Sequence, residues 1–199
     1  MLVAIAGSQG SGKTVIINKL KEKGYETVER KTSRSILADW NVSLNEVNNN
    51  PELTLKFQEE ILKRKLNDES QAVAESKSGL IVTERTFIDL ATYSLVALGK
   101  DNEHNDWLNQ YITECGQCNQ TYDLVFYLKA GHFSIENDGV RGANVHYSRM
   151  VDVVMYDLMQ QHTMPGRLVV IDTPILEQRV SLITNFINAY AAREKGYKV

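Results

Sequence analysis

Residues 7–14 read GSQGSGKT, and their types and spacing are those of a loop that binds phosphate groups. Glycine leaves room for a ligand beside the backbone, and the successive N–H groups of such a loop bind phosphate oxygens. In the pattern G-x-x-x-x-G-K-S/T, the lysine reaches the β and γ phosphates of a nucleotide and the hydroxyl binds Mg²⁺. The sequence therefore predicts a nucleotide site formed by Gly7, Gln9, Gly10, Ser11, Gly12, Lys13 and Thr14.

The segments around this loop have the order that a phosphate-binding loop needs. An apolar run of strand length, residues 2–6, precedes it, and residues 13–24 follow with apolar side chains at helical spacing. Gly24 ends that helical pattern. We expect Lys13 to face solvent until a nucleotide binds.

The rest of the chain alternates between strand and helix patterns. Further strands are predicted at 25–28, 80–83, 124–129 and 168–171, and helices at 51–76, 89–99, 106–116, 145–161 and 175–195. The polar stretch 45–51 is expected to be a loop. Such alternation predicts an α/β fold with a mostly parallel sheet, in which ligands bind at the carboxyl ends of the strands.

Charged residues follow three of these strands. Glu29, Arg30 and Arg34 come after the second, Glu84, Arg85 and Asp89 after the third, and Arg141 and Arg149 after the fourth. Phosphoryl transfer needs cations around the moving group. A hydroxyl acceptor also needs a carboxylate base, whereas a phosphate acceptor needs arginines. Both kinds of group are present, so this pattern alone leaves the acceptor open.

Composition limits the class of protein. The net charge of −3 gives no reason to expect binding to long nucleic acid, although modified DNA stays open as a substrate. No apolar stretch approaches the ~20 residues that span a bilayer. Without a signal-peptide pattern, we expect a cytoplasmic protein that does not bind membranes. Cys115 and Cys118 form a lone C-x-x-C, which we interpret as two reduced thiols rather than half a zinc site or a redox pair.

Two rival classes of nucleotide-binding protein lack their signatures here. A GTPase would carry D-x-x-G and N-K-x-D, and neither string occurs in the chain. A motor-type ATPase would end an apolar strand in Asp followed by an acidic residue, whereas the third strand ends in LIVTER. A small-molecule kinase uses every feature found, including the arginines.

The whole chain resembles the P-loop nucleoside and nucleotide kinases. TERTFIDLATYS is similar to their Asp/Glu-Arg-Ser/Thr element after the third strand, and FQEEILKR is similar to a base-reading helix of deoxynucleoside kinases. DGVRGANVHYSRMVD resembles the arginine-bearing flap of phage and bacterial AAA-type kinases. The resemblance implies one domain over 1–199, a five-stranded parallel sheet in the order 2-3-1-4-5, and a short lid at about 131–149.

The same resemblance implies a role for individual residues. Gln58 would bind the acceptor base and Arg85 its 5′ group, assisted by Arg30 and Arg34. Glu84 stands where thymidylate kinases carry Asp, and would bind Mg²⁺ together with Thr14. The expected catalytic residues are Lys13, Glu29, Arg141 and Arg149.

The function that we favour is transfer of a phosphoryl group from ATP, with Mg²⁺, to a deoxynucleoside monophosphate. Three arginines are more than a neutral hydroxyl acceptor needs. Two alternatives stay open, namely a kinase of a hydroxyl on a nucleoside or on a modified base in DNA, and a regulatory ATPase that binds nucleotide. The oligomeric state is open as well, with a homodimer as one option.

Overall fold

The computed structural model describes residues 1–28, 33–100, 102–133 and 144–194. Within them, five parallel strands form one sheet in the order β2-β3-β1-β4-β5. The strands are β1 (Leu2–Ala6), β2 (Glu26–Thr27), β3 (Ile81–Glu84), β4 (Leu124–Leu128) and β5 (Leu168–Ile171). The described helices are α1 (Lys13–Glu22), α2 (Ser33–Trp40), α3 (Leu44–Asn49), α4 (Pro51–Glu75), α5 (Phe87–Leu98), α6 (Asn105–Asn119), α7 (Val145–His162) and α8 (Leu176–Glu194).

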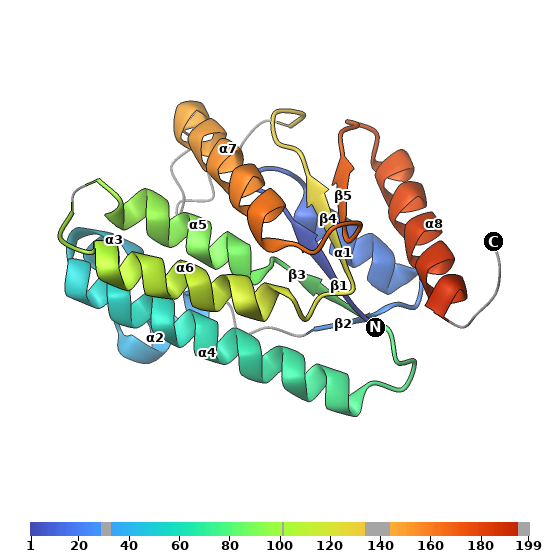
Figure 1. Ribbon diagram of the computed structural model, residues 1–199, viewed down its shortest axis with the longest axis horizontal. Helices are drawn as coiled ribbons and strands as arrows, with labels where there is room; N and C mark the ends of the chain where they lie inside the picture. Colours follow the sequence, from blue (N-terminus) through green and yellow to red (C-terminus); the bar gives the residue numbers. More distant parts are fainter. Residues whose placement is uncertain (29–32, 101, 134–143, 195–199) are drawn as a thin grey trace.

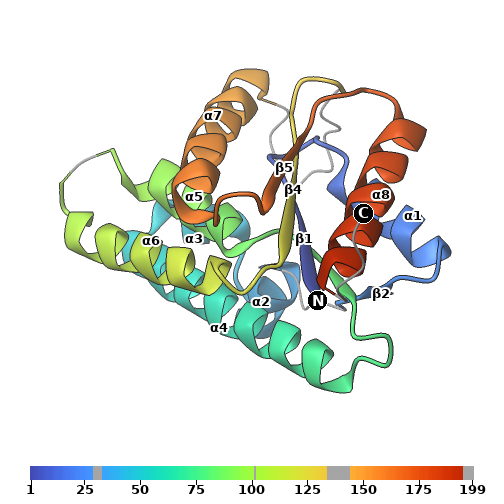
Figure 2. The same ribbon diagram turned by 45° about the vertical axis from the view of Figure 1, so that its right-hand side comes forward.

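Helices cover both faces of this sheet (Figures 1 and 2). One core lies between the sheet and the helices α4, α5, α6 and α7, and the other lies between the sheet and the helices α1 and α8. Successive residues of β1 point into opposite cores, Ala4 into the first and Ile5 into the second. Because every residue of β1 is buried, the strand reads as a continuous apolar run, as expected in the middle of a parallel sheet.

The register brings the ends of β1 and β3 together. Ile5 pairs with Glu84, and the backbone N–H of Arg85 donates to the carbonyl oxygen of Ile5 at 2.8 Å. The phosphate-binding loop, residues 7–12, directly follows β1, so Glu84 and Arg85 lie beside it. The predicted convergence of charged residues on one edge of the sheet is confirmed for these two elements.

Two helices were not predicted. The structure has α2 at Ser33–Trp40, and α3 occupies most of the stretch 45–51 that we expected to be a polar loop. The cause is local, because the Ser43 hydroxyl accepts from the Glu46 N–H and the Glu46 carboxylate accepts from the Ser43 N–H. This reciprocal cap satisfies helix-terminal donors and compensates for the weak helix propensity of asparagine.

The predicted lid at 131–149 falls largely on residues 134–143, which lie outside the described part of the chain. A single domain over 1–199 also stays a prediction.

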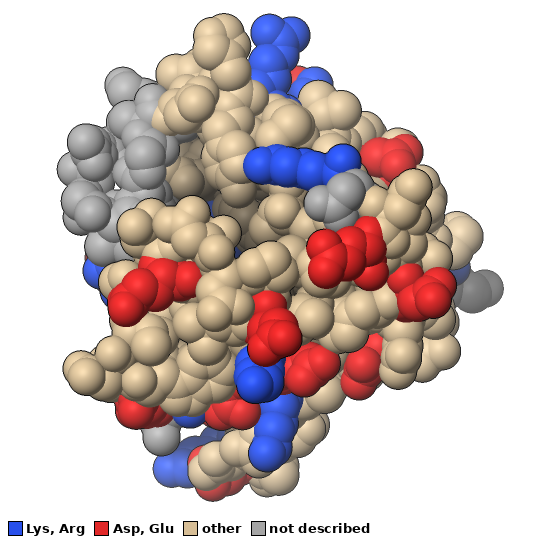
Figure 3. All heavy atoms as spheres, turned by 90° about the vertical axis from the view of Figure 1, so that its left-hand side faces the viewer, with Lys and Arg blue, Asp and Glu red and all other residues tan. Residues whose placement is uncertain are grey.

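Both cysteines are free thiols, and burial raises the pKa of Cys115. In the described residues no group of three or more His, Cys, Asp or Glu side chains could hold a metal. None of the described helices is both long enough and apolar enough to cross a membrane. On the face in Figure 3, Lys and Arg are interspersed with Asp and Glu rather than forming a continuous basic surface.

Candidate active site

The phosphate-binding loop contains three glycines with positive φ. The φ angles of Gly7, Gly10 and Gly12 are 141°, 76° and 90°. At Gly7 a Cβ would lie 2.5 Å from the carbonyl oxygen of Leu128 and 2.7 Å from Oγ of Ser11. Both the backbone conformation and the close approach of β4 therefore require glycine at position 7. This is the geometry in which consecutive N–H groups can face one phosphate.

Lys13 lies inside this loop, and the prediction that it faces solvent is wrong. Its side chain is buried, with 6% of the residue exposed. Nζ donates to the carbonyl oxygens of Gly7 at 2.7 Å and Ser8 at 2.9 Å. The reason is electrostatic, since a buried ammonium needs acceptors, and the loop carbonyls are the ones in reach. Reaching a γ phosphate would require Lys13 to exchange these carbonyls for phosphate oxygens.

Thr14 and Glu84 meet at the start of α1. The Thr14 hydroxyl donates to Glu84 Oε1 at 3.1 Å and lies 3.3 Å from Oε2. Thr14 is exposed and Glu84 is partly exposed, so water can reach both. A hydroxyl and a carboxylate are hard oxygen ligands, and Mg²⁺ in such sites keeps several waters and takes other ligands from the phosphates. The two residues predicted as metal ligands therefore fit Mg²⁺.

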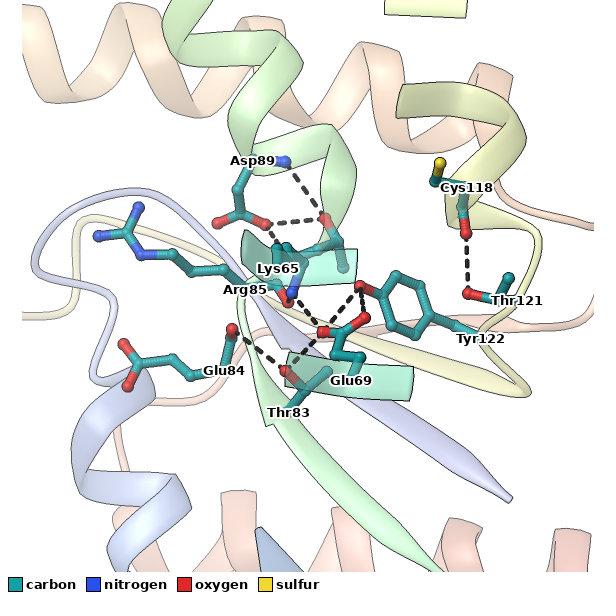
Figure 4. Close-up of polar contacts among 10 residues, drawn as sticks. Lys65, Glu69, Thr83, Glu84, Arg85, Asp89, Cys118, Thr121 and Tyr122 are labelled. Carbon is teal, nitrogen blue, oxygen red and sulfur yellow. Dashed lines mark hydrogen bonds and ion pairs between the residues drawn. The ribbon is translucent and has the colours of Figure 1, made fainter. Parts of the chain in front are cut away.

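Arg85 directly follows β3 in an uncommon backbone conformation. Its φ is 67°, and its guanidinium lies 5.6 Å from the centroid of the Tyr93 ring. Burial alone would lower the pKa of Arg85, but Tyr93, Asp89 and Glu84 together raise it. Figure 4 shows the side chains of Glu84 and Arg85 directed to the same side, that of the phosphate-binding loop and α1. A permanent cation is thus held beside the loop.

Gln58 lies on the face of α4 that packs toward the sheet. It is only 8% exposed, and its backbone carbonyl accepts from the Tyr111 hydroxyl at 2.9 Å. Among the described residues its side-chain amide has no hydrogen-bond partner. Neither of its amide atoms is among the buried side-chain atoms that lack a partner, so water can reach the amide and a ligand could replace that water. The neighbouring Phe57 instead packs in the core against Trp40, with ring centroids 6.1 Å apart.

The first turns of α7 are attached to the phosphate-binding loop. Oγ of Ser148 donates to the carbonyl oxygen of Gln9 at 3.2 Å, and Oγ of Ser8 donates to Asp152 Oδ1 at 3.2 Å. The Tyr127 hydroxyl donates to the same oxygen of Asp152 at 2.7 Å. Burial, with the nearby Asp152 carboxylate, raises the pKa of Tyr127. These contacts join the loop to α7. They therefore also determine the position of Arg149, which is exposed on that helix.

Arg179 supports the other side of the loop. It is fully buried in α8, and Nη1 donates to the carbonyl oxygen of Ser11 at 2.6 Å. Its guanidinium also lies 4.8 Å from the centroid of the Phe133 ring. Burial lowers the pKa of Arg179, but a guanidinium keeps its proton in proteins. Arg179 is therefore always charged, and it holds the loop through the carbonyl oxygen of Ser11.

A family model described as an AAA domain matches residues 2–179. This chain belongs to that AAA-domain family. No curated protein sequence matches it.

Several solved structures resemble the protein over almost its whole length. A deoxyadenosine kinase from M. mycoides with bound dATP has a TM-score of 0.68 at 19% identity, covering 94% of this chain and 100% of that one. The structure of that kinase with bound dCTP gives a TM-score of 0.69 at 18% identity, over 95% and 100% of the two chains. The NadR protein in complex with NR gives 0.64 at 13% identity, over 86% of this chain and 44% of that one. At these identities the likeness shows the fold.

The predicted P-loop kinase fold and the resemblance to the nucleoside and nucleotide kinases are confirmed by this family match and fold. The predicted site residues are only partly brought together by the described structure. The loop, Thr14 and Glu84 are in contact, and Arg85 adjoins them. Arg34 is exposed on α2. Glu29, Arg30 and Arg141 lie outside the described residues.

Three residues that hold the loop in place were not predicted from the sequence, namely Ser148, Asp152 and Arg179. The first two lie one helical turn apart, a spacing that places them on one face of α7. Arg179 carries a stronger signal, since it interrupts the apolar stripe that continues through Val180, Ile183 and Ile187 of α8. A cation on an otherwise buried stripe needs a fixed acceptor, and the carbonyl of Ser11 is that acceptor.

Proposed function

We propose that this protein transfers the γ-phosphoryl group of ATP to a deoxynucleoside-type acceptor. The observation that carries the proposal is the contact of Thr14 with Glu84, because it joins the phosphate-binding loop to the strand end that presents Arg85. A donor site and a cation for a second substrate thus adjoin one another. A protein that only binds a nucleotide has no need of the second part.

On the donor side, the loop N–H groups bind the phosphates and Lys13 moves onto the β and γ phosphates. Mg²⁺, when bound by Thr14 and Glu84, neutralises charge on the phosphate oxygens. Arg149, with Arg141 from the segment before α7, would stabilise the charge that spreads over the transferring group. Ser148 and Asp152 orient α7 for this task through their contacts with the loop.

On the acceptor side, Arg85 would bind the 5′ end of the substrate and Gln58 would bind its base. A guanidinium can hold a phosphate through two parallel, charge-assisted hydrogen bonds. The side-chain amide of Gln58 offers both a donor and an acceptor to a base edge. The arginines at 30, 34 and 85 favour an acceptor that already carries a phosphate, which is a deoxynucleoside monophosphate.

A second candidate acceptor is the free deoxynucleoside. Glu29 stands where nucleoside kinases carry the carboxylate that removes a hydroxyl proton. The solved structures with the same fold include a deoxyadenosine kinase with the products dCMP and dCDP. Transfer to a nucleoside hydroxyl gives dCMP and transfer to a monophosphate gives dCDP, so these products are compatible with either acceptor. That enzyme has 20% identity with this chain, so its substrate is a suggestion for this one.

The deciding experiment is to incubate the protein with γ-labelled ATP, Mg²⁺ and a panel of acceptors. The panel holds the four deoxynucleosides, their monophosphates and modified DNA. Labelled diphosphate formed from an added deoxynucleoside monophosphate supports the first acceptor, and labelled monophosphate formed from an added deoxynucleoside supports the second. Release of labelled phosphate alone, with no acceptor labelled, would refute the kinase proposal and favour a regulatory ATPase.

Two variants give an independent reading of the same question. With a monophosphate acceptor, Arg85→Ala should be severe and Glu29→Gln mild, because no hydroxyl proton has to be removed. With a hydroxyl acceptor, Glu29→Gln should abolish transfer and Arg85→Ala should matter less. The readout is kcat/KM for the acceptor, and the two patterns have opposite orders.

A further inference from the structure

A buried ion pair lies directly behind the proposed acceptor cation. Lys65 and Glu69 are one turn apart on α4 and form a salt bridge. Lys65 is 1% exposed and Glu69 is 3% exposed. Neither residue belongs to the phosphate-binding loop. Figure 4 shows the pair on the opposite side of the β3 end from the guanidinium of Arg85.

Each member of the pair has further partners. The Glu69 carboxylate accepts from the Thr83 hydroxyl at 2.7 Å and from the Tyr122 hydroxyl at 3.0 Å. Lys65 Nζ donates to the backbone carbonyl oxygen of Arg85 at 2.9 Å and lies 5.1 Å from the centroid of the Phe87 ring. The network therefore runs from α4 through Thr83, near the end of β3, to the backbone of Arg85.

The backbone at Arg85 needs such support. A φ of 67° lies in the left-handed region, which residues other than glycine rarely adopt, and it persists only where surrounding contacts determine it. Here the N–H of Arg85 is held by Ile5 and its carbonyl oxygen by Lys65. The two contacts grip the same residue from both sides, and its side chain is then directed toward the loop.

Stability alone does not account for this arrangement. Two charges buried together generally contribute no more to stability than a well-packed apolar pair of the same volume. What an apolar pair cannot supply is a fixed donor to the Arg85 carbonyl. We propose that Lys65 and Glu69 are positioning residues that hold Arg85 in its left-handed conformation, so that the guanidinium meets the 5′ end of the acceptor. This inference rests on the proposed role of Arg85 as an acceptor ligand.

The test is the double variant Lys65→Met/Glu69→Met, which removes both charges and so avoids leaving one of them buried alone. The acceptor is the member of the panel that the wild type phosphorylates fastest. We expect acceptor kcat/KM to fall on the order of 10- to 100-fold, since small displacements in a site have effects of that size. We expect KM for ATP to change by less than about threefold, because the variant should displace Arg85 and leave the phosphate-binding loop in place. Lys63→Met, at an exposed position of α4, is the matched control and should leave both values unchanged.

Crystal structures supply a readout that does not depend on activity. In the double variant we expect Arg85 to leave the left-handed region and its guanidinium to leave the Tyr93 ring. If the wild type labels no acceptor, the proposed function fails, and the position of Arg85 still decides the inference. An unchanged Arg85 together with unchanged acceptor kinetics would overturn it and reduce the pair to a part of the core.

Tyr122→Phe is the second variant, chosen in case the double variant does not fold. It removes one hydrogen bond to Glu69 and leaves the rest of the network. We expect a decrease in acceptor kcat/KM of about three- to tenfold, roughly the value of one hydrogen bond. Acceptor kinetics equal to those of the wild type in this folded variant would count against the inference.

Discussion

Two parts of the same sheet edge carry the same kinds of charged group in opposite environments. The inner wall, defined here as Lys13, Lys65, Glu69 and Arg85, lies at the ends of β1 and β3 and within α1 and α4. The outer rim, defined as Lys129, His132 and Asp172, lies at the ends of β4 and β5. Asp172 accepts from Lys129 at 3.2 Å and is 2.7 Å from Nε2 of His132, and its side chain is about half exposed.

The two regions differ in how strongly their charged groups determine the local geometry. In the inner wall, each ammonium is held by carbonyl or carboxylate oxygens away from water, and loss of one partner leaves the other buried and unsatisfied. In the outer rim, water and salt can replace any partner, so an ion pair there contributes little. We therefore expect the effects of substitution to decrease from the inner wall to the outer rim.

The largest effect is expected at Lys13. Lys13→Ala removes the cation that would contact the β and γ phosphates, and kcat should fall on the order of 10²- to 10³-fold, as for other electrostatic groups at a reacting centre. It also leaves the carbonyls of Gly7 and Ser8 without their donor, so the free energy of unfolding should fall by about 1–3 kcal/mol. Turnover assays and urea denaturation measure the two quantities.

Lys19→Ala is the control for this prediction. Lys19 lies on the same helix, but its ion pair with Glu22 is exposed, and stability should change by less than about 0.5 kcal/mol. A Lys13→Ala variant as stable as the Lys19→Ala variant would show that the buried contacts of Lys13 do not support the loop.

Arg85 allows its side chain and its backbone to be tested separately. Both Arg85→Ala and Arg85→Gly remove the guanidinium, and we expect a roughly 30- to 1000-fold decrease in acceptor kcat/KM for each, with ATP binding changed only a few-fold. The glycine variant should nevertheless be the more stable of the two by about 0.5–1 kcal/mol, because alanine keeps the strain of positive φ. Equal stability of the two variants would mean that the left-handed conformation is not maintained against strain.

The sequence predicted the fold well because the signals for it are local and periodic. Apolar runs marked most of the strands, though not β2, whose two residues are Glu26 and Thr27, and the glycine pattern marked the loop that follows β1. The contact of Thr14 with Glu84 was also within reach, since parallel strands bring their carboxyl ends to one edge. Periodicity failed at α3, where a reciprocal cap outweighed the polar composition.

The residues that hold the site in place could not be derived in the same way. Lys65 and Glu69 look like an ordinary i,i+4 surface pair in a sequence, and only the packing of α4 against β3 reveals that they are buried. The inward position of Lys13 depends on the carbonyl directions of a loop with three positive φ angles, which composition does not encode. Tertiary placement therefore decides which charges determine geometry.

Asp152, which is partly exposed, should give an effect of intermediate size. Asp152→Ala removes the acceptor shared by the Ser8 and Tyr127 hydroxyls, so α7 loses one of its contacts with the loop. We expect the free energy of unfolding to fall by about 1–3 kcal/mol and KM for ATP to rise by roughly three- to tenfold, the effect of one lost hydrogen-bonded partner. Asp157→Ala, at an exposed position of α7, is the control and should be silent in both assays. A silent Asp152→Ala would place this carboxylate with the outer rim.

The smallest effect is expected at Asp172, where it depends on pH. The hydrogen bonds from His132 and Lys129 lower the pKa of Asp172 in the folded protein. A carboxylate with a lowered folded pKa stabilises the protein above its unfolded pKa, about 4, and that contribution is lost as the pH falls through the folded value. Asp172→Asn should therefore reduce Tm slightly at pH 7, and the difference from wild type should vanish in acid. Because the pair is exposed, roughly 0.5 M NaCl should also remove most of the difference at pH 7. Calorimetry of both proteins at pH 7 and at a series of falling pH values, with and without salt, measures this. A difference that survives both acid and salt would contradict the contrast between the outer rim and the inner wall.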